Sequence, residues 1–267
     1  MKISFIGAGN MASAIIESIV RSGRFSPGSI YVFDKISDKA RRFEGLGAVF
    51  CSTLSDACEQ GDVILLAVKP QDYDGLLCDI KNCCKDVSKK TFISIAAGIS
   101  CEYITKSLKA DVPVVRVMPN TPITLGLGAT AISRNGFVND KLYSKICSIF
   151  ACCGVVCALD ESLMNEVICV SGSSPVYVYM LAKIMIENAI SSGISEKMAK
   201  ELVLQTIRGS VEMMAKTGKS ASELMDDVAS PGGTTIEAIK TLEDGGFYEL
   251  VTNAMNACTK RAEELSK

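Results

Sequence analysis

Two glycine-rich segments carry the residues best suited to binding anions. The first, GAGNMA, has the form GxGxxA and lies between an apolar run and a helical pattern. In such a loop the first glycine allows a tight turn, the second lets the backbone approach a pyrophosphate, and the small last residue lets the helix pack closely. The N–H groups at the helix start add positive potential. We therefore expect a dinucleotide cofactor at Gly7, Ala8, Gly9, Asn10 and Met11.

An acidic residue follows the second apolar run, SIYVFD. Asp34 stands where an acid commonly accepts hydrogen bonds from the adenosine ribose and would repel a 2'-phosphate, which favours NADH. Lys35, Lys39, Arg41 and Arg42 come next and offer charges for a 2'-phosphate, although such a run is usually a solvated helix face. NADH and NADPH both stay open, and Asp34 favours NADH.

Three further loops follow apolar runs and extend the predicted cofactor site. They are AVKPQ, AAG and MPNTP. Open α/β sheets bind ligands at the carboxyl ends of their strands, small residues permit close approach by a nicotinamide, and prolines stiffen a loop. A lysine at such a point contacts the cofactor or faces solvent. The residues expected to contact the cofactor are Ala67, Val68, Lys69, Pro70, Ala97, Gly98 and Asn120.

The second glycine-rich segment, SPGGTT, lies far from the first and precedes the helical pattern IEAIKTLE. Glycines leave backbone amides uncovered and Pro231 fixes one dihedral angle, so this helix start is suited to a second anion. The alternative is a plain turn in which Ser230 or Thr234 caps the helix. The residues alone support both interpretations equally.

The composition limits the chemistry. The 267 residues contain no histidine, which excludes histidine-based catalysis and removes a common zinc ligand. The twelve cysteines are scattered through apolar patterns, without a CxxC motif, so we expect reduced thiols and no metal site. A net charge of -2 without a long basic run favours a small-molecule partner over nucleic acid or an anionic membrane.

The elements that position these loops divide into two regions. Up to Ala158, the apolar runs KISFIG, SIYVFD, DVILLAV, TFISIAA, VPVVRVM, GATAIS and GVVCAL alternate with helical patterns. This rhythm predicts an α/β Rossmann domain with a doubly wound, mostly parallel sheet over residues 1–159. Only helical periodicity follows, which predicts an all-α domain over residues 160–267.

One stretch, PVYVYMLAKIMIENAI, is apolar nearly all round. It contains Lys183 and Glu187 and is shorter than the roughly 20 residues that span a bilayer, so we expect a buried helix and no membrane partner. Burial against a second subunit and a plain core within the domain both stay open. The first residues, MKISFIGAGN, lack the apolar region of a signal peptide, and we expect a cytoplasmic protein.

Six segments together resemble the pyrroline-5-carboxylate reductase family: GAGNM, AVKP, AAG, RVMPNTP, SGSSPVY and SPGGTT. The resemblance covers essentially the whole chain, and MPNTP combined with SPGGTT is its specific part. It implies NAD(P)H-dependent reduction of the cyclic imine 1-pyrroline-5-carboxylate to L-proline, the last step of proline biosynthesis, by hydride transfer to the C=N carbon. It also implies no metal, no covalent intermediate, and a homodimer through the helical domain that often assembles into a homodecamer.

The same resemblance assigns site residues. SPGGTT is similar to the family's substrate loop, where serine and amides hold the carboxylate and a threonine contacts the ring nitrogen. These residues are Ser230, Gly232, Gly233, Thr234 and Thr235, with Thr235 in the catalytic position. SGSSPVY departs from the usual SGSGPAY at Ser174 and Val176, which could reshape the turn, and only Ser173 and Pro175 are carried over as substrate-binding. Glu161 and Asn165, where aspartate is common, receive no role.

Two alternatives stay open. A β-hydroxyacid dehydrogenase-like oxidoreductase would use a helix lysine as acid and base, but Lys183 lies several residues beyond the expected place. A non-catalytic dinucleotide-binding sensor would keep GAGNMA and would not need SPGGTT.

Overall fold

The computed structural model describes residues 1–266, which form two compact units. The first contains Met1–Ser173 together with the segment from Cys258 onward, and the second is Ser174–Ala257. The domain boundary expected at residue 159 therefore differs from the boundary of the compact units. The difference arises because the short helices after Asp160 and the end of the last helix pack against the first unit.

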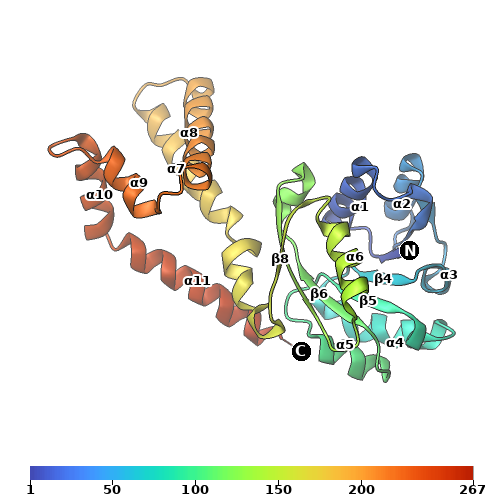
Figure 1. Cartoon of the computed structure of the whole chain (residues 1–267). Helices are drawn as coiled ribbons and strands as arrows, with labels where there is room; N and C mark the ends of the chain where they lie inside the picture. The colour runs from blue at the N-terminus through green and yellow to red at the C-terminus, as the bar shows by residue number, and fades with distance from the viewer. Residues whose placement is uncertain (267) are drawn as a thin grey trace. The chain divides into compact units, whose positions relative to one another are not determined.

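An eight-stranded sheet forms the centre of the first unit (Figure 1). Its strands are β1 (Ile3–Ile6), β2 (Ile30–Phe33), β3 (Val49–Phe50), β4 (Val63–Leu66), β5 (Thr91–Ser94), β6 (Val114–Met118), β7 (Gly128–Arg134) and β8 (Gly154–Ala158). They lie in the order β3-β2-β1-β4-β5-β6-β7-β8, and every pair is parallel except β6 with β7. The mostly parallel sheet is confirmed. Only the two-residue β3 is missing from the sequence-based expectation.

Helices cover both faces of the sheet. The helices α1 (Asn10–Ser22), α2 (Ser37–Arg41) and α6 (Asp140–Phe150) lie on one face, and α3 (Leu54–Gln60), α4 (Tyr73–Cys83) and α5 (Cys101–Leu108) lie on the other. Successive strand residues point to opposite faces, so Leu65 packs in the first core and Leu66 in the second. Gly23, with φ 65°, ends α1 as a left-handed cap.

Short helical turns connect these elements. They are η1 (Pro27–Ser29), η2 (Arg42–Leu46), η3 (Pro70–Asp72), η4 (Val87–Lys89), η5 (Thr121–Leu125) and η6 (Glu161–Leu163), followed by the π-helix η7 (Ile168–Gly172). Two of them, η3 and η5, belong to the predicted cofactor loops AVKPQ and MPNTP.

The second unit is helical, as predicted. It contains α7 (Pro175–Ser191), α8 (Glu196–Lys216), α9 (Ala221–Val228), α10 (Thr234–Asp244) and the first part of α11 (Phe247–Glu264). Helix α8 packs against α7 and α9. The end of α11 belongs to the first unit.

Helix α7 is not buried within a single chain, so the alternative of a plain core within the domain is wrong. Among its residues only Ala182 is buried, and Tyr179 is 59% exposed. The stretch Ile168–Ser191 is long and apolar enough to cross a membrane by length and composition. Of its most apolar 18 residues, 17% are buried within the chain. An apolar surface of this extent usually marks an interaction site. The exposure therefore favours the second-subunit alternative.

Candidate functional site

The first glycine loop has the conformation that phosphate binding needs. Gly7 has φ 103°, and a Cβ atom there would lie 2.6 Å from the Ala67 carbonyl oxygen, so no larger residue fits. Gly9 is the N-cap of α1, and no described atom lies within 4 Å of its Cβ position. Ala12 is buried against the sheet. The first-turn amides of α1 thus face an open surface where an anion fits.

Asp34 fixes the same loop. Its carboxylate accepts hydrogen bonds from the Ala8 N–H at 2.7 Å and from the Ile36 N–H at 2.8 Å. Each carboxylate oxygen has room for a further donor, so these bonds leave capacity for ribose hydroxyls. Among the cations that follow Asp34, Arg42 donates to Ser13 Oγ on α1, and its guanidinium stacks on the Phe43 ring at 4.6 Å. The pair Asp34 and Arg42 thus lies next to the start of α1.

The loop after β4 adjoins the glycine loop. The Ala67 N–H donates to the Ile6 carbonyl at 2.8 Å, which continues the β1–β4 pairing to this edge. Lys69 is exposed and begins the turn η3. The structure thus brings AVKP and GAGN to one edge of the sheet. A cofactor contact by Val68, Lys69 or Pro70 stays a prediction.

Asn120 in MPNTP already has protein partners for its side chain. The amide donates to the Ser171 carbonyl at 3.0 Å and accepts from the Ala129 N–H at 2.9 Å, and the residue is 7% exposed. Sequence reasoning treated this amide as free for the cofactor. Any contact with a cofactor would compete with these two bonds.

The backbone of Gly98 in AAG packs against Leu265, a contact that the sequence did not predict. Gly98 has φ 75°, and a Cβ atom there would lie 2.8 Å from the Leu265 carbonyl oxygen. The close approach is made by the C-terminal segment of the same unit. Ala97 packs against the small apolar cluster that contains Met118 and Ala262.

A buried arginine leads into MPNTP. Arg116 on β6 is 4% exposed, its Nη2 donates to Asn165 Oδ1 at 2.7 Å, and its Nη1 lies 4.0 Å from Glu161 Oε1. Burial lowers the pKa of the Arg116 guanidinium below its usual value, and Glu161 opposes this shift. The Arg116 Nε has no hydrogen-bond partner among the described residues. Sequence reasoning gave Glu161 and Asn165 no role, although a charge inside the apolar run VPVVRVM was a signal.

The loop SPGGTT forms a tight turn before α10. The Gly233 N–H donates to the Ser230 carbonyl at 2.9 Å, and Pro231 followed by Gly232 with φ 73° matches a type II turn. Gly233 is the N-cap of α10 and no side chain caps the helix. The capping role considered for Ser230 or Thr234 is therefore wrong. The first-turn amides of α10 remain open to an anion.

Thr235, in the first turn of α10, lines a pocket of about 410 Å³ within the second unit. The wall is mostly apolar and contains Ile239 of the same helix together with Ser210, Met213, Met214, Leu224, Met225 and Val228 of α8 and α9. Thr235 is half-buried. A hydroxyl both donates and accepts a hydrogen bond, and apolar surroundings strengthen such bonds.

The segment SGSSPVY tolerates its departure from the family pattern. Ser174 has helical dihedral angles, φ -61° and ψ -23°, so a serine there causes no backbone strain. The hydroxyl of Ser173 accepts a hydrogen bond from the Cys258 thiol at 3.3 Å, and Pro175 is the first residue of α7. Contact of Ser173 or Pro175 with a substrate stays a prediction.

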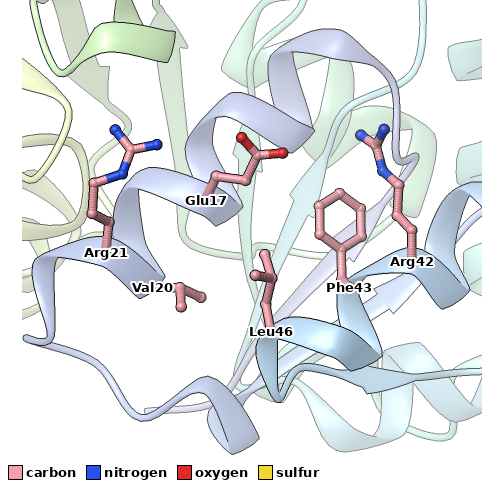
Figure 2. A pocket seen from close by; sticks show the side chains of 6 residues that line it. All are labelled: Glu17, Val20, Arg21, Arg42, Phe43 and Leu46. Carbon is pink, nitrogen blue, oxygen red and sulfur yellow. The ribbon is translucent and has the colours of Figure 1, made fainter.

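A separate pocket of about 440 Å³ lies between α1 and η2. Figure 2 shows its lining side chains, which are Glu17, Val20, Arg21, Arg42, Phe43 and Leu46. None of these residues belongs to the glycine loop, AVKP, AAG, MPNTP or SPGGTT. The pocket therefore lies outside these five loops and shares only Arg42 with the residues discussed for the cofactor.

Two family profiles match the chain. The profile described as pyrroline-5-carboxylate reductase dimerisation matches residues 161–265, and the profile described as NADP oxidoreductase, coenzyme F420-dependent, matches residues 2–98. The first match contains the exposed helix α7 and the loop SPGGTT. The second contains the glycine loop and the loops after β4 and β5.

Relatives that match over the full length include enzymes named pyrroline-5-carboxylate reductase. The chain is 36% identical over 268 residues to the pyrroline-5-carboxylate reductase of Escherichia coli, covering 100% of this chain and 98% of that protein. The enzyme of the same name from Arabidopsis thaliana is 34% identical, with 100% and 96% covered. Among solved structures, pyrroline carboxylate reductase from Plasmodium falciparum with NADP bound superposes with a TM-score of 0.90 at 29% identity, covering 100% of this chain and 98% of that one.

Proposed function

The chain belongs to the pyrroline-5-carboxylate reductase family, and we propose that its loop SPGGTT binds the substrate carboxylate while Thr235 serves the imine nitrogen. The chain is an oxidoreductase that reduces 1-pyrroline-5-carboxylate to proline with a nicotinamide cofactor. This activity replaces the two alternatives, the β-hydroxyacid dehydrogenase and the non-catalytic sensor.

The uncapped start of α10 is the observation that carries the proposed substrate site. Because no side chain caps α10, its first-turn amides offer N–H donors and the positive end of the helix dipole to the carboxylate. These groups hold an anion without a cation that would oppose the developing iminium. No described atom lies within 4 Å of the Cβ position of Gly232, so this residue adds no side chain over the helix start.

Thr235 is suited to follow the nitrogen through the reaction. When bound, the nicotinamide cofactor supplies the hydride to the C=N carbon. The nitrogen gains a proton, and the Thr235 hydroxyl is able to accept a hydrogen bond from the iminium and to donate one to the amine. The side chain therefore works by positioning and hydrogen bonding and does not need to ionise.

Replacing Thr235 with alanine tests this role. A hydrogen bond to a charged group contributes about 1.5–3 kcal/mol, so we expect kcat to fall roughly 10- to 100-fold with NADH affinity near normal. Thr241→Ala is the matched control, because Thr241 lies on the same helix and its hydroxyl bonds only the Glu237 carbonyl in the described structure. Loss of cofactor binding with normal turnover in Thr235→Ala would refute the assignment.

The substrate assignment has its own assay. Well-folded protein is mixed with NADH and pyrroline-5-carboxylate, and separately with NAD and 3-hydroxyisobutyrate. We expect NADH oxidation in the first mixture and no reduction of NAD in the second. Protein that binds NADH and fails with the first substrate would contradict the assigned reaction.

We propose that NADH is the preferred cofactor. Asp34 lies beside the glycine loop, where its charge would repel a 2'-phosphate. Arg42 beside Ser13 is the feature that favours NADPH. Measuring kcat/KM with both cofactors decides between them, and a higher value with NADPH would overturn the preference.

The assembly follows from the matched dimerisation region. The chain forms a homodimer through its helical region and acts on a small molecule. Further assembly into a decamer, a cytoplasmic location and the lack of nucleic-acid or membrane partners are part of the proposal. Measuring the mass of the assembly in solution tests the decamer, and a mass of two chains at working concentration would exclude it.

A further inference from the structure

The last residues of the described chain contact two of the loops assigned to the cofactor. We define the C-terminal anchor as Cys258, Ala262, Leu265 and Ser266. All four belong to the same compact unit as the sheet. We propose that the C-terminal anchor positions the loops AAG and MPNTP and thereby sets cofactor affinity, an inference that rests on the proposed cofactor role of those loops.

The first contact is steric and involves AAG. The Leu265 carbonyl lies so close to Gly98 that a Cβ atom would approach its oxygen to 2.8 Å and its carbon to 2.9 Å. Gly98 also has φ 75°, a conformation that favours glycine. The anchor therefore packs directly on the backbone of AAG and limits where this loop can move.

The second contact is apolar and reaches both loops. Ala262 packs in one cluster with Met118, the first residue of MPNTP, and with Met164 and Ile168. Ala97 of AAG packs against the same cluster. One small apolar cluster thus lies between the end of α11 and the two loops. Because side chains in such a cluster are close-packed, a shift of the helix end would displace both loops.

The third contact is a chain of hydrogen bonds. Asn165 Nδ2 donates to Ser266 Oγ at 2.9 Å, and Asn165 Oδ1 accepts from Arg116 Nη2 at 2.7 Å. Arg116 lies on β6, the strand that leads into MPNTP. This chain connects the anchor to the buried guanidinium.

The direction of these bonds explains why residue 165 is an asparagine. The Ser266 hydroxyl donates its hydrogen to the Ala262 carbonyl at 2.9 Å, so its oxygen must accept from residue 165. The asparagine amide supplies a donor for Ser266 and an acceptor for Arg116 at once. An aspartate would keep the bond to Arg116 and would bond Ser266 only after the hydroxyl turned away from the Ala262 carbonyl.

Ser266→Ala removes the bond between Ser266 and Asn165 and leaves the Asn165 acceptor for Arg116 in place. We expect this variant to raise the Kd of the reduced cofactor by about threefold to tenfold, with the KM of pyrroline-5-carboxylate unchanged. Ser266→Thr keeps the hydroxyl and should keep the wild-type affinity.

The measurement is a fluorescence titration of the full-length dimer with NADH and NADPH, alongside steady-state kinetics. Ser148→Ala is the matched control, because its hydroxyl bonds a helix carbonyl at 2.7 Å in the same unit and has no tertiary partner in the described structure. Far-UV circular dichroism checks that all variants are folded.

The inference is overturned by an unchanged cofactor Kd in Ser266→Ala, by an equal rise in the substrate KM, or by a raised cofactor Kd in Ser266→Thr. Failure of the proposed function gives a different result. Wild-type protein would then bind the cofactor and leave pyrroline-5-carboxylate unreduced, whereas the Kd values would still report on the anchor.

Discussion

Replacing Gly233 with alanine tests whether the turn in SPGGTT presents the α10 amides to the substrate. Gly233 has φ -82°, so alanine brings no backbone strain there. Its Cβ would lie 2.6 Å from Ser230 Oγ and 3.0 Å from the Ser230 carbonyl oxygen. The hydroxyl can rotate away. The carbonyl cannot move without opening the turn, because it accepts the Gly233 N–H at 2.9 Å.

The size of the effect follows from what the displaced turn would lose. Misplacing one or two N–H donors to a carboxylate costs about 1.5–3 kcal/mol. We therefore expect the KM of pyrroline-5-carboxylate to rise roughly 10- to 100-fold in Gly233→Ala. The Kd of NADH should not change, since the affected residues belong to the substrate loop.

Gly218→Ala is the matched control in the same unit, outside the substrate loop. Gly218 has φ 72° and no described atom within 4 Å of its Cβ position, so alanine adds strain of about 1–2 kcal/mol without a clash. We expect a lower melting temperature and a substrate KM within about threefold of wild type. Steady-state kinetics and thermal denaturation measure both quantities. A wild-type KM in Gly233→Ala, or a larger KM change in Gly218→Ala, would refute the reasoning.

Three further predictions concern the cofactor loop, the dimer and the thiols. Gly7→Ala should weaken NAD(P)H binding at least about tenfold in a fluorescence titration, because its Cβ would lie 2.6 Å from the Ala67 carbonyl oxygen. Normal affinity would contradict this. Met180→Glu should convert the dimer to monomers in analytical ultracentrifugation, since Met180 is 58% exposed on α7; an intact dimer would remove α7 from the interface. Iodoacetamide at pH 8 should alkylate exposed Cys157 and spare Cys153, because burial raises the pKa of the Cys153 thiol to about 11 and the thiolate is the reactive form. Peptide mass spectrometry reads both sites, and modification of Cys153 in folded protein would contradict its burial.

Features with a local cause could be predicted from sequence. Six of the seven apolar runs became strands with mostly buried residues, because burial on both faces of a sheet selects continuous β-branched and apolar residues, and the seventh became the largely exposed edge strand β8. Gly7 was recognised because a tight turn excludes most other residues, and this restriction acts within the turn itself, where Gly7 has φ 103°. The resemblance in SPGGTT supplied the family, which the relatives confirm.

Features that depend on distant partners could not be predicted. The sequence of α7 left burial in the domain core and burial against a second subunit both open, and only the fold shows that a single chain leaves the helix exposed. Asn120 looked free for a ligand, but Ser171 and Ala129 occupy its amide. A sequence pattern indicates that a buried polar side chain needs a hydrogen-bond partner. Which residue becomes that partner depends on which segments the fold brings together.

The sequence by itself thus determined the sheet, the glycine turns and the family, because each rests on local backbone preference or on a motif within a few residues. The tertiary structure alone decided that Leu265 covers Gly98 and that Asn165 connects Ser266 to Arg116. These residues lie far apart along the chain. Their contacts exist only because the last helix returns to the sheet, and no local preference encodes that return.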